Sequence, residues 1–207
     1  MTSTTTTTPS VTPSATWLRR RGFWLAYASM AWMTAEAAVA ITAGVLASSI
    51  ALTGFGLDSV IELFTAGIVV WQLRGEIAGE ERETRAMRLI GVTFFALAAY
   101  LTVAGIRDLA VRAQPHEPVA GLVITALALL VMPGLAMVKR ATGQALGNRT
   151  LIADSAETAF CAATSAATLA GVGLNIALGW WWADPAAALV IAALAVKEGT
   201  EAWKGGD

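Results

Sequence analysis

The feature that most constrains this chain is a series of long apolar runs separated by short polar segments. Several of these runs reach the roughly 20 residues that a helix needs to cross the hydrocarbon core of a bilayer. Only 14% of the residues are charged, against roughly 25% in a typical soluble domain. We therefore expect an all-α integral membrane protein.

The apolar runs predict a bundle of six transmembrane helices. The expected spans are residues 22–46, 50–73, 88–111, 119–138, 150–176 and 181–196. The charged segments 74–87 and 139–149 are expected to be loops between helices. Pro133 predicts a kink in the fourth helix, because proline removes one backbone hydrogen bond.

The two ends of the chain are expected to lie outside the bundle. Residues 1–18 begin with a stretch made almost entirely of Thr, Ser and Pro. Such a segment buries too little apolar surface to offset the entropy of ordering it, so a disordered tail is predicted. Residues 19–204 then form the transmembrane domain, and no soluble C-terminal domain is expected.

The positions of Lys and Arg predict the orientation in the membrane, because cytoplasmic loops carry an excess of these residues. A cytoplasmic N-terminus places twelve of the fourteen on the cytoplasmic side and leaves Arg107 and Arg112 outside. An even number of helices returns the C-terminus to the cytoplasm. We expect a multi-pass protein of the cell inner (plasma) membrane.

At least five acidic residues fall inside the predicted spans. They include Glu36, Asp58, Glu62, Asp154 and Glu157. No Lys or Arg lies in the middle of an expected span, so these acids are interpreted as unpaired. An ionisable side chain within the bilayer costs a few kcal/mol even on lenient scales and normally marks a pathway or a site. A bound cation, or protons, would supply the missing positive charge.

The spacing of these residues indicates a metal site. Asp58 and Glu62 are four residues apart on the second expected helix, and Glu157 and Cys161 are four apart on the fifth. Side chains at this spacing share a helix face, with Cβ atoms about 5–6 Å apart. Two such helices facing each other would supply the four ligands of a tetrahedral site.

The other polar candidates are assigned lesser roles. Asp154 lies on the same face as Glu157, one turn away, and could receive protons or support a ligand from behind. Glu36 could join this proton path or only form a hydrogen bond to a neighbouring helix. Cys161 could equally be a small packing residue. His116 lies in an expected outer turn and is interpreted as solvated.

At these two segments the chain resembles the cation diffusion facilitator family of divalent metal/proton antiporters. The second-helix segment Gly54-Phe-Gly-Leu-Asp58-Ser59-Val-Ile-Glu62 is similar to the family's acidic motif, with Asp58 and Glu62 at its ligand positions. The fifth-helix segment Ala153-Asp154-Ser-Ala-Glu157-Thr-Ala-Phe-Cys161 is similar to the second motif. Trp182-Ala-Asp184-Pro185 also looks like the family's start of the sixth helix.

The resemblance covers about residues 19–204 and has two departures. Glu157 stands where the family usually has His, and Cys161 where it usually has Asp. The cytoplasmic domain that many members use for dimerisation and metal sensing has no counterpart here. The resemblance therefore implies a compact member, for which a homodimer is expected and the preferred metal is left open.

These expectations combine into one functional hypothesis. The chain is expected to transport zinc or a similar divalent cation (cadmium, cobalt or manganese) outward in exchange for protons, and not to be an enzyme. The thiolate favours zinc and cadmium over magnesium or calcium. The net charge of −1 gives no indication of nucleic-acid binding. Two alternatives are an exporter of small organic cations and a membrane metal-binding or scaffold protein that transports nothing.

Overall fold

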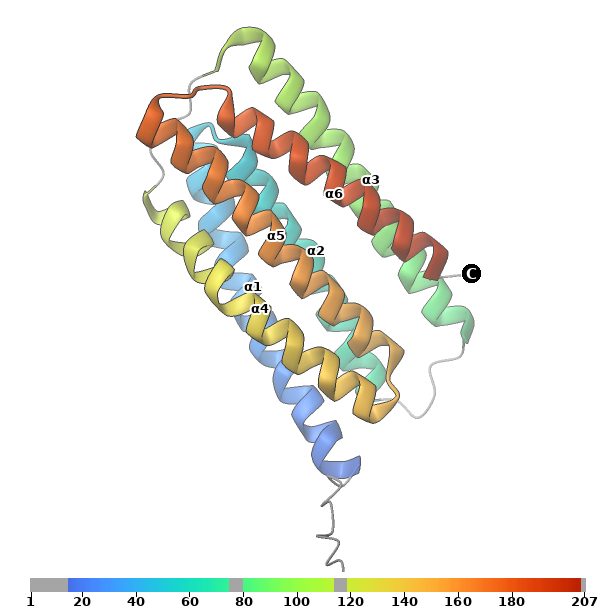
Figure 1. Cartoon of the computed structure of the whole chain (residues 1–207). Coiled ribbons are helices and arrows are strands. Elements are labelled where there is room, and N and C mark those ends of the chain that lie inside the picture. The colour runs from blue at the N-terminus through green and yellow to red at the C-terminus, as the bar shows by residue number, and fades with distance from the viewer. Residues whose placement is uncertain (1–14, 75–79, 114–118, 206–207) are drawn as a thin grey trace, which may run out of the picture.

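The computed structural model describes residues 15–74, 80–113 and 119–205, and this part of the chain is helical apart from short turns. The helices are α1 (Ala15–Ala47), α2 (Ile50–Arg74), α3 (Glu80–Val111), α4 (Val119–Leu146), α5 (Arg149–Leu178) and α6 (Ala183–Gly205). Figure 1 shows them running up and down in alternation. The all-helical class predicted from the sequence is confirmed.

Several helices extend beyond the apolar runs. The first begins at Ala15, the third begins at Glu80 instead of residue 88, and the fourth continues through Pro133 to Leu146. A helix can continue through polar residues at the membrane interface. Hydropathy therefore indicates the apolar part of each helix and not the residues where the helix begins and ends. The predictions for the tail before residue 15 and for His116 lie outside the described residues.

The helices form two groups. In the first, α1 packs along α2, α4 packs along α5, and contacts of α1 with α4 and of α2 with α5 join the two pairs. The second group is the pair α3 and α6, which touches α2 and α5. Figure 1 shows this pair lying side by side along one flank of the bundle, next to α5 and α2. Gly91 and Gly199 let the α3 and α6 backbones approach closely, because a Cβ at either would lie 3.0–3.2 Å from the other's carbonyl oxygen.

Five of these helices, α1 to α5, are long and apolar enough to cross a membrane. Their outward side chains include Leu130 and Val103, which are 78% and 70% exposed. Such a surface suits contact with lipid. These features identify a multi-pass membrane protein.

The sixth helix is not among those that are long and apolar enough to cross a membrane. Between Asp184 and Lys197 it has twelve uncharged residues, a rise of about 18 Å, which is shorter than the ~30 Å hydrocarbon core. It nevertheless packs along α3 as part of the bundle. The count of six spans therefore stays a prediction.

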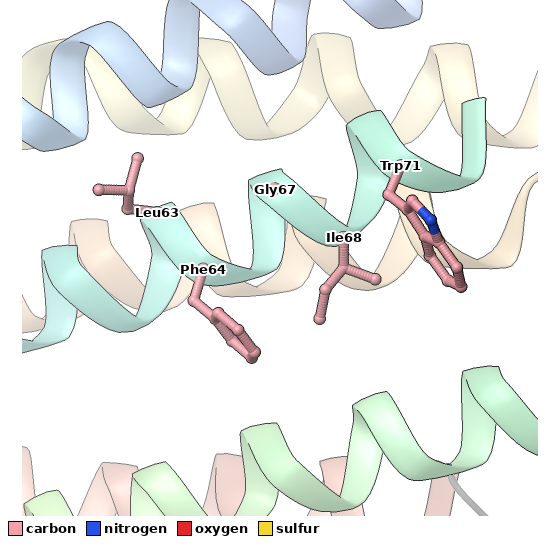
Figure 2. A pocket seen from close by; sticks show the side chains of 5 residues that line it. All are labelled: Leu63, Phe64, Gly67, Ile68 and Trp71. Atoms are coloured by element: carbon pink, nitrogen blue, oxygen red, sulfur yellow. The ribbon is translucent and has the colours of Figure 1, made fainter. Parts of the chain in front are cut away.

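The second helix has an apolar side and a polar side. Figure 2 shows Phe64, Ile68 and Trp71 projecting from one side of α2, where with Leu63 and Gly67 they line a pocket. No ionisable side chain lines this pocket, so it does not suit an ion. The carboxylates of α2 are on its buried side.

Candidate functional site

The predicted ligands of α2 and α5 lie in the interior of the bundle. Asp58 and Glu62 are eight and twelve residues after the first residue of the 25-residue α2, which places them near its middle. Their exposed fraction is 2% each. Glu157 and Cys161 of α5 are buried as well. The sequence pattern thus placed four titratable groups correctly in the core of the bundle.

Threonine hydroxyls join the acids of α2 to α5. The Thr164 hydroxyl donates to Asp58 Oδ2 at 3.1 Å, and the Thr158 hydroxyl donates to Glu62 Oε1. In the reverse direction, Thr65 of α2 is the hydrogen-bond partner of Glu157 on α5. From residue 58 to residue 65 along α2, the partners on α5 run backwards from residue 164 to residue 157, as expected for antiparallel neighbours. Each acid of the predicted site therefore has a threonine on the facing helix.

Glu36 brings α1 into the same region. Its carboxylate accepts hydrogen bonds from the Ser59 hydroxyl at 2.6 Å and from the Trp32 indole N–H. The Cys161 thiol also donates to Glu36 Oε1, at 3.4 Å. Glu36 is completely buried and connects α1 with both helices that carry the predicted ligands.

The prediction that no basic residue pairs with these acids is wrong. Lys139 was assigned to a loop, but it lies within α4, is completely buried and places its Nζ 2.9 Å from Asp154 Oδ2. The same nitrogen lies 3.7 Å from Glu62 Oε1 and donates to the Thr158 hydroxyl at 2.8 Å. The ammonium can be buried because these partners replace its water. Asp154 is thus an ion-pair partner and not an unpaired acid.

The predicted tetrad is not drawn together as a ligand cage. Among the residues that the structure describes, no three His, Cys, Asp or Glu side chains are close enough to hold one metal ion. Two of the predicted ligands nevertheless keep spare capacity, because Glu62 Oε2 and Glu157 Oε2 are buried and accept no hydrogen bond within the described bundle. Buried polar atoms are normally paired, so these two oxygens mark where a cation or a proton would be accepted.

Asp184 has a structural role at the end of the bundle where α2 begins. Its carboxylate accepts hydrogen bonds from the Ser49 hydroxyl and from the backbone N–H groups of Ile50 and Ala51, at 3.0 and 3.4 Å for the two amides. These are orphan donors of the first turn of α2. Asp184 of α6 therefore caps α2 and ties the α3–α6 pair to the other four helices.

Reasoning from the sequence missed Lys139 and the three threonines. Lys139 stands at the point where the apolar run of the fourth helix ends, so its position in the sequence favours a loop. Thr164 lies in residues 162–171, a stretch of mostly Ala, Thr, Ser and Gly that is typical of close helix packing. Their positions relative to the predicted ligands could have indicated them, because Thr158 follows Glu157 directly and Thr164 is three residues after Cys161.

Comparison with known proteins shows that the chain is similar to a membrane protein. The chain is 28% identical over 138 residues to "Transmembrane protein 163" of Xenopus laevis, and the match covers 66% of this chain and 49% of that protein. The chain thus spans about half the length of the curated relative it matches. No family model matches the chain. The similarity agrees with a membrane protein, as the apolar helices indicate.

Proposed function

We propose that this protein is a proton-coupled transporter of divalent metal cations, of the zinc type. The observation that carries the proposal is the excess of buried acid at the α1, α2 and α5 interface. Glu36, Asp58, Glu62, Asp154 and Glu157 are all buried there. Lys139 is the single buried Lys or Arg among the side chains that the structure describes.

This excess needs positive charge from outside the chain. If all five acids were ionised, one ammonium would leave four negative charges in a poorly solvated interior, at a high electrostatic cost. Metal cations and protons are the kinds of positive charge small enough to fit between packed helices. An organic cation would need a cavity, and the pocket beside α2 is lined by apolar side chains without an acid.

Exchange between the two kinds of charge gives the transport mechanism. Carboxylate and thiolate groups bind a metal in their deprotonated form, so metal binding releases protons and proton binding releases metal. A site that is loaded alternately by protons and metal performs antiport. We propose Asp58, Glu62, Glu157 and Cys161 as the metal ligands, with Glu36 as the hydrogen-bond partner of Cys161. In a cell the proton gradient would then drive the metal out across the inner membrane.

The ligand set also indicates the class of metal. The three carboxylates are hard oxygen donors, and Cys161 is a soft donor that favours zinc and cadmium. Binding requires the side chains of α2 and α5 to leave their threonine partners and converge. Hydrogen bonds to hydroxyl groups are weak enough for this exchange, since each contributes about 0.5–1.5 kcal/mol net.

A binding measurement tests the proposal. Purified protein in detergent is titrated with zinc or cadmium while proton release into a weakly buffered solution is followed. We expect saturable binding that a stoichiometric chelator reverses, with protons released on metal addition. Metal binding that a tetraalkylammonium ion displaces would indicate an organic-cation site instead. Absence of metal binding would contradict the proposal.

A further inference from the structure

We propose that Lys139 is a resident cation of the site, whose ammonium competes with the transported metal for Glu62 while Asp154 restrains it. This inference rests on the proposed function and deepens it, because it names a residue that sets how tightly the site holds its cation. Lys139 is a positioning residue: it touches a proposed ligand and is not itself a ligand.

The geometry around Lys139 carries the inference. Its Nζ lies between two acids of different helices, 2.9 Å from Asp154 Oδ2 on α5 and 3.7 Å from Glu62 Oε1 on α2. It also donates to Thr158 Oγ1 at 2.8 Å, and the same hydroxyl donates to Glu62. All four groups are buried. The ammonium therefore acts on Glu62 directly and through Thr158.

Charge determines what this arrangement does to a metal ion. A divalent cation that binds Glu62 would sit within a few ångströms of a fixed positive charge, in a medium where charges interact much more strongly than in water. Lys139 should therefore weaken metal binding. A transporter gains from this weakening, because an ion held too tightly is released slowly.

The position of Asp154 explains why the ammonium does not block the site. Lys139 lies seven residues before the end of α4, and Asp154 lies five residues after the start of α5. The pair is therefore nearer to an end of the bundle than Glu62, which lies near the middle of α2. The shorter contact is the one to Asp154. This carboxylate holds the ammonium away from the middle of the bundle and leaves Glu62 Oε2 without a hydrogen-bond partner in the described structure.

Removing each partner in turn should change the affinity in opposite directions. Lys139→Met keeps the length of the side chain and removes its charge, so we expect the cadmium dissociation constant to fall by about tenfold or more. Asp154→Asn releases the ammonium toward Glu62, so we expect the dissociation constant to rise by a similar factor. Lys139→Arg keeps the charge and should stay near wild type.

The double variant Lys139→Met with Asp154→Asn separates competition from ligation. It removes both members of the ion pair together, so neither is left buried without its partner and folding is protected. Competition predicts that this variant binds cadmium more tightly than wild type, because Glu62 is freed of the ammonium. If Asp154 were itself a metal ligand, the double variant would bind more weakly. If either single variant fails to fold, the comparison of cadmium binding between the double variant and wild type still distinguishes competition from ligation.

The experiment is cadmium titration of the full-length protein, with cadmium flux in liposomes as a second measurement. The matched control is Lys197→Met, which removes an exposed lysine whose Nζ lies 3.1 Å from Glu201 on α6 and should change neither quantity. We expect Lys139→Met to bind more tightly and to transport more slowly. A merely structural role would lower stability without shifting affinity and rate in these opposite senses.

The outcomes distinguish the two levels of the proposal. Wild-type protein that binds no cadmium would overturn the proposed function and this inference together. Wild-type binding, with a double variant that is unchanged or weaker, would overturn only the role of Lys139. Tighter binding in the double variant, with opposite shifts in the two single variants, would support it.

Discussion

Individual acids in the bundle interior should be necessary for transport. Replacing Asp58 or Glu157 by Ala removes a proposed ligand and one buried carboxyl group, so we expect metal flux to be lost while the protein stays folded. The loss of a ligand should weaken metal binding by roughly ten- to a hundredfold or more. Flux assays with size-exclusion profiles check this. Normal transport by either variant would contradict the assignment.

A control for these variants is available on α6. Glu201 is an exposed acid whose partner is Lys197, far in sequence from the proposed ligands. Glu201→Ala should transport as wild type. Surface ion pairs contribute about 0–1 kcal/mol, so its stability should change little.

The identity of the metal should depend on Cys161. Cys161→Asp keeps a negatively charged ligand but replaces the soft donor, so we expect transport to continue with a lower preference for cadmium over manganese. Cys161→Ala should weaken binding of all metals, and of cadmium most. Competition between the two metals measures the preference. Unchanged competition curves in both variants would show that Cys161 only packs against its neighbours.

The residues found from the sequence and those missed differ in one physical respect. Asp58 with Glu62, and Glu157 with Cys161, lie on one helix each, and a spacing of four determines that they share a face. The contacts of Glu36 with Cys161, and of Lys139 with Asp154 and Glu62, join different helices. No periodicity within one helix specifies such contacts, so only the packed structure reveals them.

At the scale of helices, the junction between α2 and α6 should be important for stability. Asp184→Ala removes the acceptor for Ser49 and for two amide groups of the first turn of α2. We expect a lower thermal midpoint, since loss of a helix cap costs about 0.5–2 kcal/mol. Cadmium affinity of the folded protein should be unchanged, because Asp184 caps the first turn of α2 and Glu62 lies near the middle of that helix. Affinity that falls while the midpoint is unchanged would contradict this role.

The extent of each helix was predicted less well than its existence. Every expected span contains a helix, but α4 extends eight residues beyond the predicted end at residue 138. The hydropathy of this region falls because of Lys139 and Arg140, although helix hydrogen bonds continue. Lys139 is accommodated by ion pairing, which a hydropathy pattern does not represent. The same error assigned it to a loop.

At the scale of the whole molecule, the orientation in the membrane can be tested by labelling. In a Cys161→Ser background, Leu178→Cys and Gln144→Cys place single thiols at opposite ends of the bundle, and both positions are exposed. With the N-terminus in the cytoplasm, a membrane-impermeant maleimide should label Leu178→Cys in intact cells. Gln144→Cys should be labelled only after permeabilisation. The reversed pattern would contradict the predicted orientation.

The most direct test of the central claim is metal flux through the purified protein in liposomes under an imposed pH gradient. Because protons and metal compete for the same carboxylates, a higher proton concentration on the side to which the metal is released should displace it from the protein. We predict that zinc or cadmium moves against the direction of proton flow, that the flux collapses when the gradient is dissipated, and that Asp58→Ala shows none. Flux that is independent of the gradient, or that persists in Asp58→Ala, would contradict the account.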